Sequence, residues 1–236
     1  MAKHNVWMSV SDLMTGLMVI FLFVAIAYMS KVQKNQEVLT DYVETRKELH
    51  DKLVQEFAGD TLKWQMAIGK DLSMKFNNPT VLFSQGSWAL TEDFQTILNE
   101  FLPRYFDILL NDELRSKIKE IRIEGHTDNV AYPALDYDAY IANVILSQRR
   151  ALSVLRYLRQ MPSFVKYSPE DQSQLEFWLT ANGLSYGKSL DENGEFTFKS
   201  GKNIDLQLSR RVEFRIVTSG DEVLENFVNK NIERND

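Results

Sequence analysis

An uncharged apolar run constrains the fold of this 236-residue chain more than any other feature of its sequence. Residues 13–30 read LMTGLMVIFLFVAIAYMS, and apolar residues recur upstream between positions 6 and 10. A membrane-crossing helix needs about 20 predominantly apolar residues. A cleavable secretory signal would begin with a basic segment and end in a small-residue cleavage site, whereas only Lys3 precedes this run. We therefore predict an uncleaved transmembrane helix within residues 1–31.

Asp12 is an acidic residue near the start of this apolar segment, and two hydroxyl residues, Ser11 and Thr15, accompany it. If the helix begins near Val6, Asp12 lies about 9 Å inside it at 1.5 Å per residue. Carboxylates at such a depth are costly, and they usually face a bundle interior or a water-filled path, where they carry protons or other ions. Alternatively, Asp12 caps the helix at the membrane surface. The residues alone leave both roles open.

The charge and residue composition argue against several classes of function. The chain has 27 basic and 33 acidic side chains, and the resulting net charge of −6 argues against direct nucleic-acid binding. It contains no cysteine, so disulfides, thiol catalysis and cysteine-based zinc sites are excluded. Its three histidines are scattered, and the spacing builds no hydrolase arrangement of a nucleophile or of paired carboxylates. We expect a protein that is not an enzyme and that has no metal or organic cofactor.

The segment after the apolar run predicts a helical stalk or linker over residues 32–75. Residues 32–58 are highly charged and lack glycine and proline, and Gly59 marks a break. Apolar residues recur there at helical spacing: Leu39, Tyr42, Val43, Leu49, Leu53 and Phe57. This narrow stripe is explained equally well by a parallel coiled coil between two copies and by packing on the chain's own domain.

The remaining chain predicts a globular domain over residues 76–218 and a polar tail or peripheral helix over residues 219–236. Alternation and capping patterns indicate strands and helices in the order β-α-β-α-β-β, which is typical of an α+β sandwich with helices on one face of a sheet. The predicted strands end at Phe83 and cover 118–124, 177–181 and 211–217, and the predicted helices begin at Thr91 and cover 137–160. Residues 183–202 are expected to form a long exposed loop.

Four short motifs in this domain occur in a recognisable order. They are Phe83-x-x-Gly86-Ser87, Ile123-Glu124-Gly125-His126-Thr127-Asp128, Asn143-x-x-Leu146-Ser147-x-x-Arg150-Ala151 and Arg210-Arg211-Val212-Glu213. In order and spacing they resemble the OmpA-like peptidoglycan-binding domain, over about residues 76–218. This resemblance implies non-covalent binding of the peptide stem of the cell wall, and in particular of its diaminopimelate residue.

The resemblance also assigns roles to individual residues. It implies that Asp128 binds the amine of diaminopimelate and that Arg150 binds its carboxylate, which suits a ligand that presents both charges on one carbon. The other residues that the resemblance associates with this groove are Thr127, Asn143, Arg210 and Arg211. We interpret His126 as a structural hydrogen-bonding residue rather than a catalytic one.

Three departures from the family pattern bear on the shape of the groove. The segment from Tyr132 to Tyr140 is longer than the compact family loop. Ser209 stands where the family usually has asparagine, and Leu190 lies near the place of a usual proline. These departures leave room for weakened or altered wall binding.

The combination of one span with an acid near its start, a stalk and this domain resembles MotB-type stator subunits. Residues 7–18, WMSVSDLMTGLM, are similar to the corresponding stretch of ZorB, the stator-like subunit of Zorya anti-phage defence systems. The resemblance implies that Asp12 carries the coupling ion, a proton or sodium, with Ser11 and Thr15 lining its path. It further implies a homodimer of this chain within a pentameric ring of a multi-span MotA-like (ZorA-like) partner.

The same resemblance bears on location and on the competing functions. Wall binding would put the span in the bacterial inner membrane, the N-terminus in the cytoplasm and the domain in the periplasm. Two other functions stay open: a flagellar MotB-type stator subunit, and a passive membrane-tethered peptidoglycan anchor without ion transport. The N-terminal segment favours defence over motility because it looks more like ZorB than like MotB.

Overall fold

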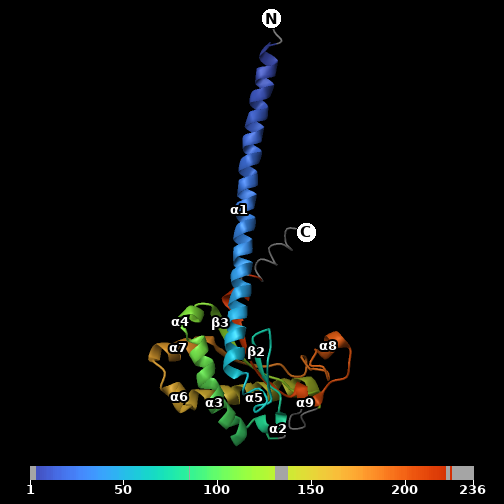
Figure 1. The fold of residues 1–236 in the computed structure, drawn as a ribbon. Coiled ribbons are helices and arrows are strands. Elements are labelled where there is room, and N and C mark those ends of the chain that lie inside the picture. Colours follow the sequence, from blue (N-terminus) through green and yellow to red (C-terminus); the bar gives the residue numbers. More distant parts are fainter. Residues whose placement is uncertain (1–3, 85, 131–137, 222–223, 225–236) are drawn as a thin grey trace. The chain divides into compact units, whose positions relative to one another are not determined.

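The computed structural model describes residues 4–84, 86–130, 138–221 and 224 (Figure 1). The chain divides into two compact units, one comprising Met1–Glu44 with Val223–Asp236 and the other comprising Thr45–Glu222. Helix α1 (His4–Phe57) contributes residues to both units. The sheet and the remaining helices belong to the second unit.

The predicted apolar N-terminal helix is confirmed as the first part of α1. It contains an 18-residue window with a mean hydropathy of 2.3, long and apolar enough to cross a membrane, and none of that window is buried within the described chain. Leu13, Phe21 and Tyr28 have exposed fractions of 73%, 64% and 69%. Lipid or a partner helix would cover such a surface.

The last turns of α1 belong to the core of the second unit. Leu49, Leu53 and Phe57 have no exposed surface, whereas Val43 is 60% exposed. Of the two interpretations of the apolar stripe, packing on the chain's own domain therefore holds for its last three positions. The helix ends at Phe57, two residues before the predicted break.

In the described part of the chain, five strands form one mixed sheet in the order β1-β2-β5-β3-β4. The strands are β1 (Met66–Ile68), β2 (Ser73–Phe76), β3 (Ile118–Gly125), β4 (Leu179–Gly183) and β5 (Val212–Thr218). β3 pairs in parallel with β4 and antiparallel with β5, and the other neighbours are antiparallel. The sheet thus begins within residues 32–75, for which the sequence predicts a stalk or linker.

Two long helices are α3 (Glu92–Leu109) and α5 (Ala139–Gln160) (Figure 1). Helix α5 packs against β3 and β4, and aromatic side chains of α3 contact β2 and β5. Both begin at side-chain caps: the hydroxyl of Thr91 accepts a hydrogen bond from the amide of Phe94, and Asp138 accepts one from the amide of Tyr140. The shorter helices are α2 (Pro79–Leu82), α4 (Asp112–Arg115), α6 (Pro162–Val165), α7 (Pro169–Trp178), α8 (Thr197–Ser200) and α9 (Leu206–Ser209).

Aromatic side chains from α1, α3 and the sheet meet in the core of this unit. The ring centroid of Phe101 lies 5.1 Å from those of Phe57 and Phe76, and 5.3 Å from that of Phe214. Each buried aromatic side chain removes about 150–250 Å² of surface from water, so such a cluster supplies a large share of the hydrophobic stabilisation. It also ties the end of α1 to the sheet.

Two predicted strands differ from the structure. The strand predicted to end at Phe83 is wrong, because Pro79–Leu82 form helix α2. Asn78 accepts a hydrogen bond from the amide of Val81, and a proline in the first turn further favours a helical start. The strand predicted over 177–181 begins only at Leu179, because α7 continues to Trp178.

The segment predicted as a long exposed loop, 183–202, is partly ordered and partly buried. Leu190 pairs with Phe196 in a β-bridge, and α8 follows. Asp191 has no exposed surface, and its Oδ1 atom accepts a hydrogen bond from the amide of Glu195, which closes a turn. The predicted tail, 219–236, lies outside the described residues except for 219–221 and 224.

Candidate functional site

A groove opens in the second unit beside the end of β3. It has a volume of about 830 Å³ and lies between α2 with its following loop, the loop after β3, α5 and α9. The residues that line it are Pro79, Thr80, Phe83, Ser84, Gly86, Thr127, Asp128, Val130, Asn143, Leu146, Arg150, Leu206 and Arg210. Apolar walls with a few charged groups are typical of a ligand site. Every predicted wall-binding residue except Arg211 is among them.

Two glycines let the elements of the groove approach one another. Gly125 ends β3, Gly183 ends β4, and the two are paired in register. A Cβ atom on Gly125 would overlap the carbonyl oxygen of Ser147, and one on Gly183 would overlap the amide nitrogen of Gln148. Glycine is required at such close backbone approaches. Helix α5 therefore lies directly against the strand ends, which brings its side chains toward the loop after β3.

Asp128 is the acid among the described residues that line the groove. Its side chain is 8% exposed. Oδ1 accepts a hydrogen bond from the amide of Val130 at 3.0 Å, which orients the carboxylate. Oδ2 faces Nε of Arg210 at 3.4 Å. The backbone amide of Val130 thus holds Oδ1 in place. Oδ2 faces the half-exposed side chain of Arg210, which a ligand could displace.

Arg150 is held in place by the motif around Phe83. Its Nε atom donates a hydrogen bond to the carbonyl oxygen of Ser87 at 3.0 Å. Its guanidinium carbon lies 4.9 Å from the ring centroid of Phe83, a cation–π contact. Because these contacts come from the motif Phe83-x-x-Gly86-Ser87, this motif orients the guanidinium before any ligand arrives.

Two further polar side chains line the groove. Thr127 is 2% exposed, and its Oγ1 atom is buried without a hydrogen-bond partner among the described residues. The Nδ2 atom of Asn143 donates hydrogen bonds to the carbonyl oxygens of Val130 at 2.9 Å and Ala139 at 3.0 Å. Asn143 therefore positions the loop after β3 against the start of α5.

Arg211 is buried away from the described groove lining. Its Nε atom donates to Oε1 of Glu213 at 2.6 Å, and its terminal nitrogens donate to the carbonyl oxygens of Ser209 and Lys188. The sequence associates Arg211 with the groove next to Arg210, but the structure directs the two side chains into different surroundings. The cause is strand pairing: the carbonyl of Arg211 accepts a hydrogen bond from the amide of His126 at 3.0 Å, so Arg211 already continues the β3–β5 ladder.

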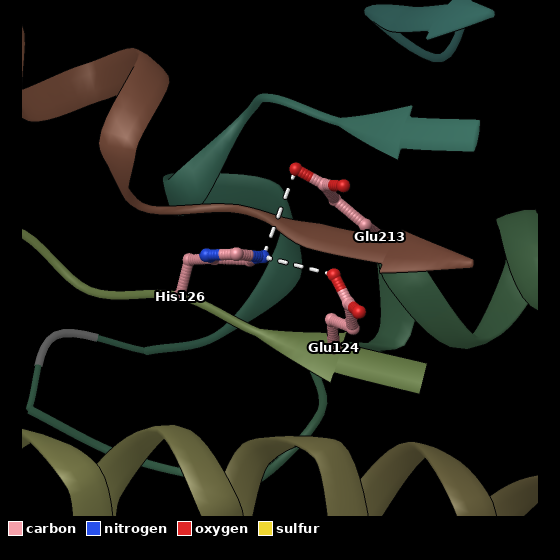
Figure 2. Close-up of side chains that lie close together, drawn as sticks. All are labelled: Glu124, His126 and Glu213. Carbon is pink, nitrogen blue, oxygen red and sulfur yellow. Dashed lines mark ion pairs between the residues drawn. The ribbon is translucent and has the colours of Figure 1, made fainter. Parts of the chain in front are cut away.

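Glu124, His126 and Glu213 form a buried cluster (Figure 2). Nε2 of His126 points between the two carboxylates, 3.7 Å from Oε2 of Glu124 and 3.6 Å from Oε1 of Glu213. The same two oxygens face guanidinium groups, Arg215 Nε at 3.3 Å and Arg211 Nε at 2.6 Å. A metal ion would have to compete with both guanidinium groups for these oxygens. We therefore interpret the cluster as a buried ionic network rather than a metal centre.

The electrostatics of this cluster agree with a structural role. Burial alone would raise the pKa of Glu124, but His126 and the charge of Arg215 lower it to about 2. Burial lowers the pKa of His126 in spite of the two neighbouring carboxylates. Burial would also raise the pKa of Glu213, but the charge of Arg211 holds it below its usual value. At pH 7 the cluster therefore contains two ionised glutamates and a neutral histidine.

The predicted ion-carrying residues lie in the first unit, on α1. Asp12, Ser11 and Thr15 are exposed, and the hydroxyl of Thr15 donates a hydrogen bond to the carbonyl oxygen of Ser11 at 2.8 Å. Residues three and four positions apart share one side of a helix, so these residues form one polar patch on an apolar helix. Gly16 adjoins this patch, and a Cβ atom on it would meet nothing within 4 Å.

Two departures from the family pattern meet in the structure. Oγ of Ser209 accepts a hydrogen bond from the amide of Leu190 at 2.9 Å, and both residues are buried. This bond ties the segment 183–202 to the residue that precedes Arg210. The third departure, Tyr132 to Tyr140, lies outside the described residues up to position 137.

Comparison with known proteins assigns the chain to a family. The OmpA family model matches residues 82–183, which contain the motifs around Asp128 and Arg150. Zorya protein ZorB of Escherichia coli (strain Crooks) is 36% identical over 221 residues, which cover 91% of this chain and 88% of that protein. The chain belongs to the ZorB family.

Other proteins resemble this ZorB-family chain more distantly. A Zorya protein ZorB from a second Escherichia coli strain is 26% identical over 91% of this chain and 81% of that protein. The cell wall anchor of the T6SS from Pseudomonas aeruginosa has a TM-score of 0.44 and 22% identity, over 71% of this chain and 97% of that chain. The periplasmic domain of MotB has a TM-score of 0.40 and 18% identity, over 68% of this chain and 70% of that chain.

Sequence reasoning assigned no role to two glutamates of this ZorB-family chain. Glu124 and Glu213 are register partners on β3 and β5, so two like charges lie directly opposite each other. Such a pair is destabilising unless cations compensate it, and Arg211 and Arg215 do so. The alternation of charged and apolar residues in both strands indicates that each glutamate shares a face with the charged residues two positions away, but it does not give the register that pairs them.

Proposed function

We propose that this chain is a stator-like subunit of an ion-driven machine in anti-phage defence, anchored to peptidoglycan by the groove around Asp128. Membership of the ZorB family supports the defence context. One observation carries the wall-binding part: a carboxylate oriented by the backbone and a guanidinium oriented by Ser87 and Phe83 line the same groove. Binding, not catalysis, is the activity we propose for this domain.

The chemistry of the groove suits the diaminopimelate residue of a peptide stem. This residue presents an ammonium and a carboxylate on one carbon. Asp128 would bind the ammonium and the fork of Arg150 the carboxylate, both through charge-assisted hydrogen bonds. Phe83 and Leu146 provide apolar surface for the methylene chain.

Co-sedimentation of the full chain with isolated cell-wall sacculi tests this binding. Asp128→Asn and Arg150→Gln should each lower affinity at least about tenfold, because each removes a charge-assisted contact worth about 1.5–3 kcal/mol. Asp93→Asn, at an exposed site on α3 outside the groove, is the matched control and should bind normally. Normal binding by both groove variants, with thermal unfolding unchanged, would refute the wall-binding role.

The apolar part of α1 is proposed as a single inner-membrane span with the N-terminus in the cytoplasm, because the wall ligand of the second unit lies in the periplasm. Asp12 carries the coupling ion, a proton or sodium, and Ser11 and Thr15 line its path. Neutralising a carboxylate in hydrocarbon removes a cost of about 2.5–3.5 kcal/mol, enough to change how the helix packs. The membrane potential supplies about 2.3 kcal/mol per charge per 100 mV to drive such steps.

The proposed assembly contains two copies of this chain inside a pentameric ring of a multi-span MotA-like (ZorA-like) partner. Open space around Gly16 supports close approach of a partner helix beside Asp12. In this arrangement residues 1–31 form the anchor, 32–75 connect it to the wall-binding domain and supply that domain's first two strands, 76–218 form the rest of the domain and 219–236 the tail. Native mass spectrometry of the purified complex should give two copies of this chain for five of the partner, and any other ratio would contradict the assembly.

Asp12→Asn in the intact operon tests the ion-carrying role. It should abolish phage resistance while protein level and assembly stay normal. The reason is that asparagine is always uncharged and cannot bind and release a coupling proton as a carboxylate does. Asparagine keeps the size and the capping ability of aspartate, so a passive anchor would tolerate the change. Asp41→Asn, exposed on the same helix outside the apolar run, is the matched control. Retained resistance would contradict ion transport and leave a passive wall anchor.

A further inference from the structure

Arg210 and Arg211 are neighbours in sequence, but the structure holds them very differently. Arg211 is 2% exposed and makes three hydrogen bonds. The side chain of Arg210 is 41% exposed, and its Nε atom donates to the carbonyl oxygen of Leu206 at 3.1 Å and lies 3.4 Å from Asp128. The terminal nitrogens of Arg210 make no hydrogen bond within the described part of the chain. Arg210 can therefore change partners without disturbing the core.

In the part of the chain that the structure describes, the groove is lined by one more charged residue than a zwitterionic ligand can pair with. Among the described lining residues, Asp128 is the one acid, and Arg150 and Arg210 are the two cations. A ligand with one ammonium and one carboxylate pairs with one acid and one cation, which leaves one positive charge in excess. In the free groove this extra cation faces Asp128, the group to which the ammonium must bind.

We propose that Arg210 is a specificity-determining residue that exchanges partners when the ligand binds. The ammonium of the ligand replaces the guanidinium at Oδ2 of Asp128, and Arg210 then binds a second carboxylate of the same ligand. This inference rests on the proposed function and narrows its ligand: a stem peptide with a free carboxylate beside the diaminopimelate zwitterion.

The chemistry of the peptide stem supplies two such carboxylates. One is the α-carboxylate of the γ-linked glutamate, and the other, in a tripeptide stem, is the carboxylate at the opposite end of diaminopimelate. A guanidinium with two available terminal nitrogens forms a bidentate pair with a carboxylate. A carboxamide carries no charge and has only one acceptor oxygen. Arg210 therefore selects unamidated stems over stems amidated at the carboxylate that it binds.

Calorimetric titration of the full chain in detergent tests this selection. The ligands are the tripeptide L-alanyl-γ-D-glutamyl-meso-diaminopimelate and its two forms amidated at one carboxylate each, at the glutamate or at the C-terminus. The unmodified chain should bind the tripeptide about three- to tenfold more tightly than one of the amidated forms, the range expected for a partly exposed charge-assisted pair. Arg210→Gln should abolish that preference by weakening binding of the tripeptide but not of the amidated form.

Two further variants serve as controls. Arg210→Lys keeps the charge without the fork, so it should retain part of the preference. Arg156→Gln removes an exposed charge of α5 outside the groove and should retain all of it. Loss of the preference in Arg156→Gln would attribute it to overall charge and overturn the inference.

The remaining outcomes separate this inference from the proposed function. Equal affinity of the unmodified chain for all three peptides would overturn the inference, and so would an equal loss for all three in Arg210→Gln. In either case, abolished binding in Asp128→Asn would leave the proposed wall-binding function standing. Failure of the unmodified chain to bind any of the three peptides would overturn both.

Discussion

The groove and the buried ionic network use the same kinds of charged residue a few positions apart in sequence, but they satisfy them to different degrees. In the network of Glu124, Glu213, Arg211, Arg215 and His126, each carboxylate lies within 3.3 Å of a guanidinium nitrogen. In the groove, Asp128 faces the guanidinium of Arg210 at 3.4 Å, and the side chain of Arg210 is 41% exposed. Buried carboxylates that are paired with guanidinium groups hold a fold together, whereas a carboxylate that lines a cavity and faces a half-exposed cation is available to a ligand.

The largest effect that would test this comparison comes from removing the buried cation. Arg211→Met leaves Glu213 buried with one guanidinium fewer, and breaking a buried ion pair costs about 3–5 kcal/mol. We expect a loss of about 3 kcal/mol in the free energy of unfolding, at the low end because Arg215 still contacts Glu213 at 2.8 Å. Urea denaturation followed by tryptophan fluorescence measures it. Arg156→Met, at an exposed site, should change it by less than about 0.5 kcal/mol.

This contrast could be predicted only in part from the sequence. The motif order indicated that Asp128 and Arg150 share a groove, because a glycine-ended strand followed by a helix brings the two together. The same motifs could not separate Arg210 from Arg211. The direction of each side chain depends on where the pairing of β5 with β3 begins, and the amide of His126 already bonds the carbonyl of Arg211. That pairing joins residues far apart in sequence.

The same distinction holds for the fold: elements set by local contacts could be predicted from the sequence, whereas elements set by long-range contacts could not. The helices capped by Thr91 and Asp138 were predictable because a cap is a contact between near neighbours. Strands β1 and β2 have only three and four residues, too few for an alternation pattern to stand out. The burial of Leu49, Leu53 and Phe57 depends on what the rest of the chain packs against them, so the stripe alone could not decide between a coiled coil and a core.

Gly125 belongs to both halves of the comparison, because it lies between Glu124 and His126 of the network and precedes the groove loop. In Gly125→Ala, the added methyl group would overlap the carbonyl oxygen of Ser147. We expect a loss of about 2 kcal/mol in unfolding free energy, within the range for overpacked sites, together with weaker binding to sacculi because α5 must move. Gly59→Ala adds a methyl group where nothing lies within 4 Å and is the matched control. Unchanged stability and binding in Gly125→Ala would contradict the close-approach argument.

A smaller effect that distinguishes the ionic network from the groove is the pH dependence of the free energy of unfolding. Burial lowers the pKa of His126 below its ordinary value of 6.5, so between the two values the unfolded chain binds more protons than the folded chain. The free energy of unfolding should therefore fall as the pH drops below about 6.5, by at most about 1.4 kcal/mol per pH unit. Glu124, whose pKa is about 2 in the fold against an ordinary value of 4.5, adds a second loss at lower pH.

Two variants assign the upper part of this pH profile. His126→Gln should remove the loss of stability just below pH 6.5, because glutamine has no proton to bind there. Asp128→Asn alters the groove instead of the network and should retain that loss. Urea denaturation of the three proteins across this range measures the difference. Identical profiles for the unmodified chain and His126→Gln would show that His126 does not control the pH dependence of folding.

The smallest effect on stability is expected at Arg210, and it sharpens the contrast with its neighbour. Arg210→Gln removes a half-exposed ion pair, and exposed pairs contribute from nothing to about 1 kcal/mol, so the free energy of unfolding should change by less than about 0.5 kcal/mol. The same variant should lose the preference for unamidated stem peptides, whereas Arg211→Met should lose stability first. A change of about 2 kcal/mol or more at Arg210 would mean that both arginines support the fold. The division between groove and network would then not follow from burial and pairing.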